Sequence, residues 1–331
     1  MDIFAFFQTL LTPIKWIIEA ILVGFHWALT SLGLSPSAGL TWVLSIVGLV
    51  LIVRAALIPL FVRQIKSQRK MMEVAPQLKK IQDKYRGKKD QFSREAMQRE
   101  TMELYRREGT SPFSSCLPLL IQMPVFFSLF SVLNEAKNDK AGVGLLTQTL
   151  SQQFYNSELF PGAGLKYSIQ SAWTAGEPAV VVIAAIMIVL MTASQFITQL
   201  QIMSKNQSPE MLASPMYKQQ RMLLYILPLV FIFSGIAFPI GVMFYWLTSN
   251  VWTMVQQFVV IRNMPTPGSE AALAREARLA KRARARMSSD AAVLGAGAGG
   301  PDVVIEPKKI TTQRQQPVSR NRAKKQSGNK R

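Results

Sequence analysis

The sequence has almost no side chains that bind transition metals or form disulfides. Its 331 residues include one cysteine, Cys116, and one histidine, His26. A lone cysteine cannot close a disulfide within the chain, and one Cys with one His cannot supply the four ligands of a structural zinc site. We therefore expect no metal site and no bound cofactor.

Acidic residues are scarce as well. The chain has 19 Asp and Glu against 38 Lys and Arg, and 49% of its residues are hydrophobic while 17% are charged. Apolar and basic residues must therefore occupy separate stretches of the chain. This segregation is typical of membrane proteins.

Five stretches approach the 20 or so apolar residues that a helix needs to cross a hydrocarbon core of about 30 Å. They are 41–62, 113–133, 179–201, 223–240 and 241–261. The last two meet at Pro239 and Gly241, which favour a tight reversal, so these two spans should form a hairpin. The sequence thus predicts an all-α polytopic membrane protein with a five-span core over residues 41–262.

Basic residues alternate between the connecting segments. Residues 63–111 carry 14 Lys and Arg, 202–222 carry 3 and 262–331 carry 16, whereas 135–178 carry 3 and 1–40 carry one. By the positive-inside rule, the N-terminus lies outside and the C-terminus in the cytoplasm. We expect a multi-pass protein of the plasma membrane.

Residues 3–30 are apolar, but their polar side chains fall on one helical stripe. The stripe consists of Gln8, Thr12, Lys15, Glu19 and His26. This pattern favours an amphipathic helix in the outer membrane interface, with His26 at the headgroups rather than binding a ligand. A sixth span and a signal peptide are the alternatives. The signal peptide is disfavoured because charges lie inside the apolar run and no small-residue cleavage site is evident.

The cytoplasmic segment 63–111 is rich in charged helix-forming residues. Gly87 follows one periodic run, 64–86, and Gly109 follows another, 91–108, as helix C-terminal caps do. We expect two antiparallel helices with few apolar contacts and therefore some mobility. This hairpin either holds two spans in register or serves as a docking surface for a partner or client.

Arg54 is the most informative residue of the spans. It precedes the first cytoplasmic charge, Arg63, by nine positions, so a helix places it about 13 Å below that interface. An arginine at this depth costs roughly 2.5–3.5 kcal/mol, and no Asp or Glu occurs in the other four spans. A water-filled recess would accommodate the charge. The alternative is an arginine that joins helices by hydrogen bonds to backbone carbonyls.

Other spans contribute polar faces to such a recess. They comprise Thr192, Gln195 and Gln199 in the third span, Trp246, Asn250, Thr253 and Gln257 in the fifth, and Gln122 in the second. Each alone is explained as an interhelical hydrogen bond worth about 1 kcal/mol or less. Together with an unbalanced Arg54, they favour a shared hydrophilic groove.

Three motifs resemble the YidC/Oxa/Alb family of membrane protein insertases. They are VRAALIPL at 53–60, CLPLLIQMPVF at 116–126, and FPIG at 238–241 continuing to YWLTSN at 245–250. The resemblance covers residues 40–262, including the hairpin with Pro76. It implies a five-helix core with a hydrophilic groove that is open to the cytoplasm and to lipid but closed outside.

The resemblance also implies roles for individual residues. Arg54 matches the groove arginine that draws in the polar, often acidic, end of a client. Met123 and Phe126, with Gln122, fall where the second core span meets the client, and Trp246 falls at an aromatic groove position. The chain departs from some members at Val50, where they carry threonine. It also lacks the large outer domain of Gram-negative members, which indicates a Gram-positive source.

Partners follow from the same resemblance and from the basic tail, 263–331. Nascent membrane proteins are the expected clients, alone or beside the Sec translocon. The tail carries basic blocks at 270–287 and 308–331, separated by glycines at 295–300, and looks largely disordered. Such tails bind polyanions, so we expect ribosomal RNA, with anionic lipid as the alternative.

Two other classes of function fit the sequence less well. A transporter usually shows inverted repeats, and none is present. An intramembrane enzyme needs a base or a metal, whereas the five predicted spans contain no Asp, Glu or His. An insertase that performs no covalent chemistry is the favoured interpretation.

Overall fold

The computed structural model describes residues 3–88, 90–110, 117–207, 212 and 215–296. Within these residues every regular element is an α-helix, apart from isolated bridges of Glu158 with Ala38 and Gly164. The predicted all-α fold is confirmed for this part of the chain. Contacts divide the chain into two units, Met1–Leu279 and Ala280–Arg331. The basic block predicted at 308–331 lies outside the described residues.

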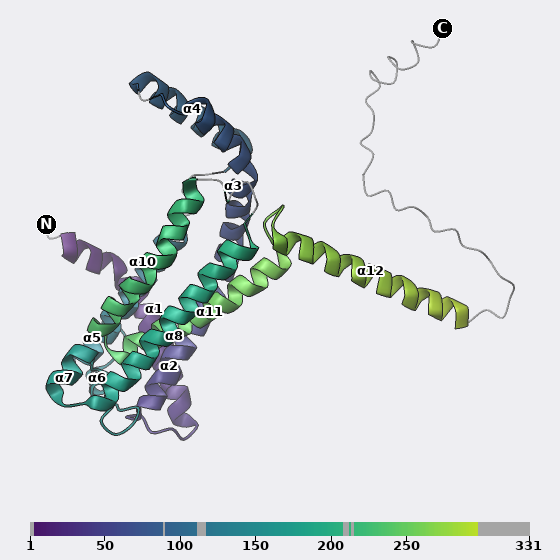
Figure 1. Cartoon of the computed structure of the whole chain (residues 1–331). Coiled ribbons are helices and arrows are strands. Elements are labelled where there is room, and N and C mark those ends of the chain that lie inside the picture. The colour runs from purple at the N-terminus through teal and green to yellow at the C-terminus, as the bar shows by residue number, and fades with distance from the viewer. Residues whose placement is uncertain (1–2, 89, 111–116, 208–211, 213–214, 297–331) are drawn as a thin grey trace, which may run out of the picture. The chain divides into compact units, whose positions relative to one another are not determined.

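The helices follow one another along the chain as shown in Figure 1. They are α1 (Ile3–Ser31), α2 (Gly39–Ala56), α3 (Ile58–Lys84), α4 (Gln91–Glu108), α5 (Leu117–Lys137), α6 (Gln148–Tyr155), α7 (Ile169–Ala175), α8 (Pro178–Lys205), α10 (Pro215–Ala237), α11 (Ile240–Asn263) and α12 (Glu270–Ala296). Helices α2, α5, α8, α10 and α11 each contain most of one predicted span.

The first predicted span, 41–62, is not one uninterrupted helix. Helix α2 ends at Ala56 and α3 begins at Ile58, with Leu57 between them. Pro59 lies in the first turn of α3, where its missing N–H costs nothing but its ring restricts the preceding backbone. The amide of Leu57 still donates to the Val53 carbonyl at 3.1 Å. The chain therefore continues from the span into the hairpin with a break of one residue.

Three helices among the described residues are long and apolar enough to cross a membrane. They are Thr9–Ser31, Gly39–Ala56 and Pro178–Lys205. Pro178–Lys205 contains the predicted span 179–201, and Gly39–Ala56 covers the first part of the predicted span 41–62. Thr9–Ser31 lies in the segment for which we expected an interfacial helix, so length and composition also allow the alternative of a further span. The spans predicted around α5, α10 and α11 stay predictions.

Three of the polar residues on the stripe of α1 face the protein, which corrects one expectation, whereas Thr12 is exposed. Lys15, Glu19 and His26 are 4%, 0% and 3% exposed. The His26 ring lies 4.2 Å from the Trp42 ring, and its Nε2 is 2.9 Å from the Pro36 carbonyl oxygen. The prediction that His26 sits at the headgroups is therefore wrong. Periodicity shows that polar residues share a face, but it does not show what that face contacts.

Glu19 joins α1 to the loop that follows α5. Its carboxylate accepts hydrogen bonds from the backbone N–H groups of Val143, Gly144 and Leu146 at 2.9, 2.7 and 3.2 Å. A Cβ at Gly142 would collide with the same carboxylate. The ion pair of Lys15 with Glu135 of α5, at 3.5 Å, adds a second polar link. Helix α1 is thus fixed to the core by a polar cluster in which Glu19 and Lys15 are buried and Glu135 is partly exposed.

Helix α11 lies at the centre of the first unit. It packs most extensively against α8, also against α2, and more lightly against α5. The buried side of α8 carries Met187, Met191, Ser194 and Thr198, and both hydroxyls bond to carbonyls of their own helix. Small and flexible side chains let these two helices approach closely. Because α11 contacts three predicted spans, its residues are well placed to build a shared site.

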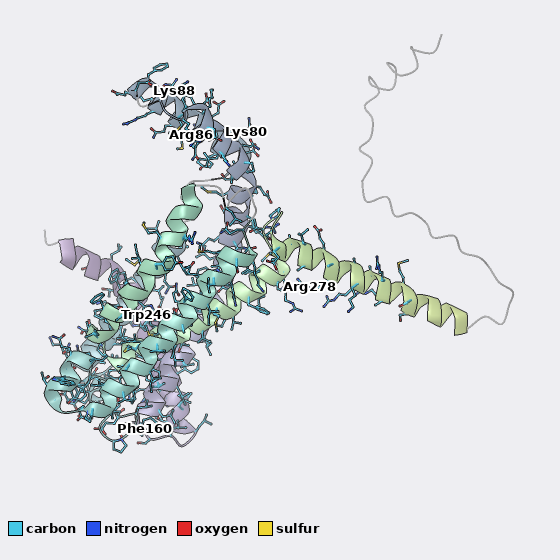
Figure 2. The ribbon with its side chains drawn as sticks, in the orientation of Figure 1. Lys80, Arg86, Lys88, Phe160, Trp246 and Arg278 are labelled. Carbon is cyan, nitrogen blue, oxygen red and sulfur yellow. The ribbon has the colours of Figure 1, made fainter. Side chains whose placement is uncertain are left out.

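Helices α3 and α4 pack together as the expected hairpin. Glu100 accepts from Lys84 at 2.5 Å and from the Tyr85 hydroxyl at 2.8 Å. These hydrogen bonds hold the pKa of the Glu100 carboxyl below its usual range and raise the pKa of Lys84. Gly109 ends α4 in the left-handed conformation, as predicted, whereas α3 already ends before Gly87. Figure 2 shows Lys80, Arg86 and Lys88 along this hairpin, far from Phe160.

Candidate functional site

Arg54 lies in the last turn of α2 and reaches across to α11. Its guanidinium donates a hydrogen bond to the Ser249 hydroxyl and lies 5.8 Å from the centroid of the Phe61 ring. The ion pairs formed by the described residues do not include Arg54. Its positive charge is therefore stabilised by a neutral hydroxyl and an aromatic face, and no acidic side chain among the described residues pairs with it. Both are weaker partners than a carboxylate.

Helix α5 contributes Gln122 and Phe126 to the same region. The Gln122 amide donates to the Tyr245 hydroxyl of α11 at 2.9 Å. The Phe126 ring lies 5.4 Å from Trp246 and 6.4 Å from Tyr245. Four residues that the sequence singled out, on α2, α5 and α11, are thus linked through a small set of contacts. We call this set the Arg54 cluster; it comprises Arg54, Gln122, Phe126, Tyr245, Trp246 and Ser249.

The open space inside the Arg54 cluster is small. A recess of about 10 Å³ is lined by Ile18, Leu49, Val50, Val53, Arg54, Gln122, Val125, Leu129 and Tyr245. A buried water molecule needs roughly 10–15 Å³ of such volume and two or more polar partners. The recess therefore holds one water molecule at most. Val50, the position at which the chain departs from some members of the family it resembles, forms part of its apolar wall.

A larger, mostly apolar recess lies beside the cluster between the start of α3 and the second half of α11. Its volume is about 310 Å³, and it is lined by Ile58, Phe61, Val62, Ile65, Trp252, Val255, Gln256, Val259, Val260, Asn263 and Met264. Phe61 both borders this recess and stacks near Arg54. A polar contact point and an apolar surface are therefore adjacent.

The remaining predicted residues lie elsewhere on the helices. Gln195 and Gln199 are half-buried on α8 and do not line the recess next to Arg54. Asn250 is 8% exposed, and its side-chain nitrogen has no hydrogen-bond partner among the described residues. Met123 is 39% exposed on the outer side of α5. The structure thus places Gln122 at the recess beside Arg54 and links Phe126 and Trp246 to that recess through Tyr245. The two glutamines of α8 lie outside it.

Two members of the cluster were not singled out from the sequence. Tyr245 and Ser249 are four residues apart, so both lie on one side of α11, and they contact Gln122 and Arg54 in turn. Serine and tyrosine are common in membrane helices, so the sequence alone gave no reason to assign these two residues to the site. Their position opposite an intramembrane arginine is the signal that identifies them.

Comparison with known proteins places these residues in a family. Residues 33–267 match the family described as 60Kd inner membrane protein. The chain is 42% identical over 329 residues to the membrane protein insertase YidC of Tropheryma whipplei, covering 98% of each chain. It is 43% identical over 281 residues to YidC of Streptomyces avermitilis, covering 83% of this chain and 63% of that protein. It is 36% identical over 293 residues to YidC of Bifidobacterium longum, covering 86% of each.

Proposed function

The chain belongs to the YidC family of membrane protein insertases, and from that membership we propose that it inserts clients through a cytoplasm-facing groove bearing Arg54. Insertion moves a polypeptide and breaks no covalent bond, so the protein is an insertase and not an enzyme. The observation that carries the groove is Arg54 itself, a charge within a predicted span whose described partner is a neutral hydroxyl.

A client with an acidic end gives Arg54 a better partner than Ser249. Hydrogen bonds between charged groups are roughly twice as strong as those between neutral ones. Exchange of the serine hydroxyl for a client carboxylate would therefore favour uptake of the client's polar end. Because the recess at Arg54 is about 10 Å³, uptake requires α2 and α11 to separate at the Arg54–Ser249 contact.

The apolar part of the client has a neighbouring surface to follow. Phe126 on α5 belongs to the Arg54 cluster, the apolar recess between α3 and α11 borders that cluster, and the exposed Met123 of α5 extends the apolar surface towards lipid. A client helix leaving this surface for lipid removes apolar area from water, which contributes about 25 cal/mol per Å². That burial drives insertion without nucleotide hydrolysis, and the protein lowers the barrier for the polar end.

The topology that serves this mechanism has five spans, an outer N-terminus and a cytoplasmic hairpin and tail. Its support is the alternation of basic segments, together with the length and apolarity of α2 and α8. In this arrangement Trp246 lies between the hairpin and the outer end marked by Phe160 (Figure 2). The outer loop, held by Glu19, closes the far side of the groove, and the Sec translocon is a candidate partner for larger clients.

Photo-crosslinking tests the proposed path of the client. We expect a crosslinker at position 122, 126 or 246 to capture a stalled nascent membrane protein, because these side chains belong to the Arg54 cluster. A crosslinker at Val189, which is 66% exposed in an open recess between α8 and α10 and lies outside the Arg54 cluster, is the control for an exposed apolar position. Equal yields from Val189 and from the three cluster positions would contradict the proposed groove.

The basic tail is proposed to bind ribosomal RNA. Truncation after Met264 should abolish most co-sedimentation with ribosomes, and the affinity of the full chain should fall steeply with salt, because each neutralised phosphate releases counterions. A second truncation after Leu279 retains the part of α12 that belongs to the first unit. If neither truncation changes ribosome binding, the proposal that the tail binds ribosomal RNA is wrong, and anionic lipid becomes the favoured partner of the tail.

A further inference from the structure

A second recess lies where α8 and α11 end and α12 begins. Its volume is about 220 Å³, and it is lined by Gln201, Lys205, Phe258, Ile261, Arg262, Glu270, Ala271, Ala274 and Arg278. All of these residues belong to the first unit, Met1–Leu279. None belongs to the Arg54 cluster, so the recess is a separate feature of the molecule.

Basic side chains dominate the charge of this recess. Lys205, Arg262 and Arg278 contribute three positive charges against one negative charge from Glu270. The described ion pairs include none of these four residues. The Arg278 guanidinium donates to the Arg262 backbone carbonyl at 2.8 Å, which fixes it near the wall. Figure 2 shows Arg278 on α12, close to the end of α11. The recess carries a net positive charge of about two, which favours an anion.

The other wall of the recess is apolar. Phe258 is 53% exposed and Ile261 is 8% exposed, and Ala271 and Ala274 lie opposite on α12. A small inorganic anion would gain nothing from this wall. A ligand that joins an anionic group to a short apolar segment would contact both sides.

The position of the recess matches the surface of a bilayer. Helix α8 has 28 residues and is a candidate membrane span. At 1.5 Å per residue it is about 42 Å long, which exceeds a hydrocarbon core of about 30 Å. Its C-terminal residues, including Gln201 and Lys205, therefore reach the level of the phospholipid headgroups.

We propose that this recess binds the headgroup of an anionic phospholipid. The phosphodiester lies among Lys205, Arg262 and Arg278, and the glycerol and first acyl carbons lie against Phe258 and Ile261. Arginine suits this role because its planar group of donors matches phosphate geometry, and basic pockets between membrane helices bind acidic headgroups. The bound lipid joins the first turns of α12 to the ends of α8 and α11 and so sets where the tail leaves the membrane.

Native mass spectrometry of the full chain, titrated with phosphatidylglycerol in detergent, tests the proposal. Arg278→Ala and Lys205→Ala should each weaken phosphatidylglycerol binding roughly fivefold, the effect of one basic residue at an anionic surface. Arg282→Ala is the matched control. It removes the same charge from the same helix at an exposed position outside the recess, so it should leave the affinity unchanged.

Further measurements separate the possible ligands and exclude misfolding. Phosphatidylcholine should bind more weakly than phosphatidylglycerol, and inorganic phosphate should not displace bound phosphatidylglycerol. Arg278→Lys, which keeps the charge, should restore most of the binding that Arg278→Ala loses. Equal losses for Arg278→Ala and Arg282→Ala would overturn the proposal, and so would full displacement by inorganic phosphate. Neither outcome bears on client insertion at Arg54, which uses other residues.

Discussion

Replacing Arg54 with alanine is expected to reduce insertion of clients with acidic translocated ends about tenfold or more. A tenfold effect corresponds to about 1.4 kcal/mol, which is modest for two opposite charges about 4 Å apart at an effective dielectric constant near 20. Without the guanidinium, the client's carboxylate enters the recess with only Gln122 and hydroxyl groups as polar neighbours. The measurement is the fraction of radiolabelled client protected in proteoliposomes that contain the purified variant.

Clients and variants with matched chemistry control this experiment. A client whose translocated end carries Asn and Gln in place of Asp and Glu should insert almost equally well with the alanine variant. Arg54→Lys should retain part of the insertion of acidic clients, because it keeps the charge. Ser249→Ala removes the hydroxyl to which Arg54 bonds but leaves the charge, so insertion of acidic clients should persist. If Arg54→Ala leaves every client unaffected, charge attraction plays no part in this protein.

Replacing Glu19 with alanine is expected to lower the free energy of unfolding more than any other substitution proposed for this chain. The carboxylate is fully buried and accepts three backbone N–H groups from residues 143–146. Hydrogen bonds to charged groups contribute about 1.5–3 kcal/mol each, and their loss leaves buried N–H groups without an acceptor. We therefore expect the free energy of unfolding to fall by at least about 3 kcal/mol. At about 2–4 °C per kcal/mol, the thermal midpoint of the purified protein in detergent should fall by about 6–12 °C.

Glu158 provides the matched control for Glu19. Its carboxylate also accepts a backbone N–H, from Gly162 at 3.1 Å, but this contact lies in an exposed turn. Glu158→Ala should therefore change the thermal midpoint by no more than a degree or two. Glu19→Gln keeps one side-chain oxygen and should fall between the two. Equal midpoints for Glu19→Ala and Glu158→Ala would show that the three hydrogen bonds contribute little.

Some residues of the candidate site could be predicted from the sequence, because their depth in the membrane and the charge or polarity of their side chains require a partner. An arginine nine residues from the interface must find a partner wherever the helices pack, and the structure gives it Ser249. Gln122 and Trp246 were predicted because they are polar or aromatic within apolar runs, and both contact members of the Arg54 cluster. These inferences use only the cost of polar groups in hydrocarbon, which is independent of the fold.

Other residues could not be assigned without the packing. Gln195 and Gln199 share a helical face, but the buried side of α8 carries Ser194 and Thr198 instead. One residue of rotation, about 100°, separates the two faces, and the pattern alone does not say which of them meets α11. The prediction that the polar stripe of α1 faces the headgroups failed for the same reason. The Glu19 carboxylate on that stripe accepts hydrogen bonds from backbone N–H groups more than 120 residues away in the chain.

The sequence by itself determined that this chain is a helical membrane protein with a positive charge, Arg54, in an apolar span and no acidic residue in the predicted spans to pair with it. It could do so because hydropathy and charge are properties of single segments. Only the tertiary structure decided which side chains share that charge's surroundings, how small the space around Arg54 is, and that Glu19 faces inward. Those outcomes depend on the rotation of each helix about its axis, and contacts between residues distant in the chain set that rotation.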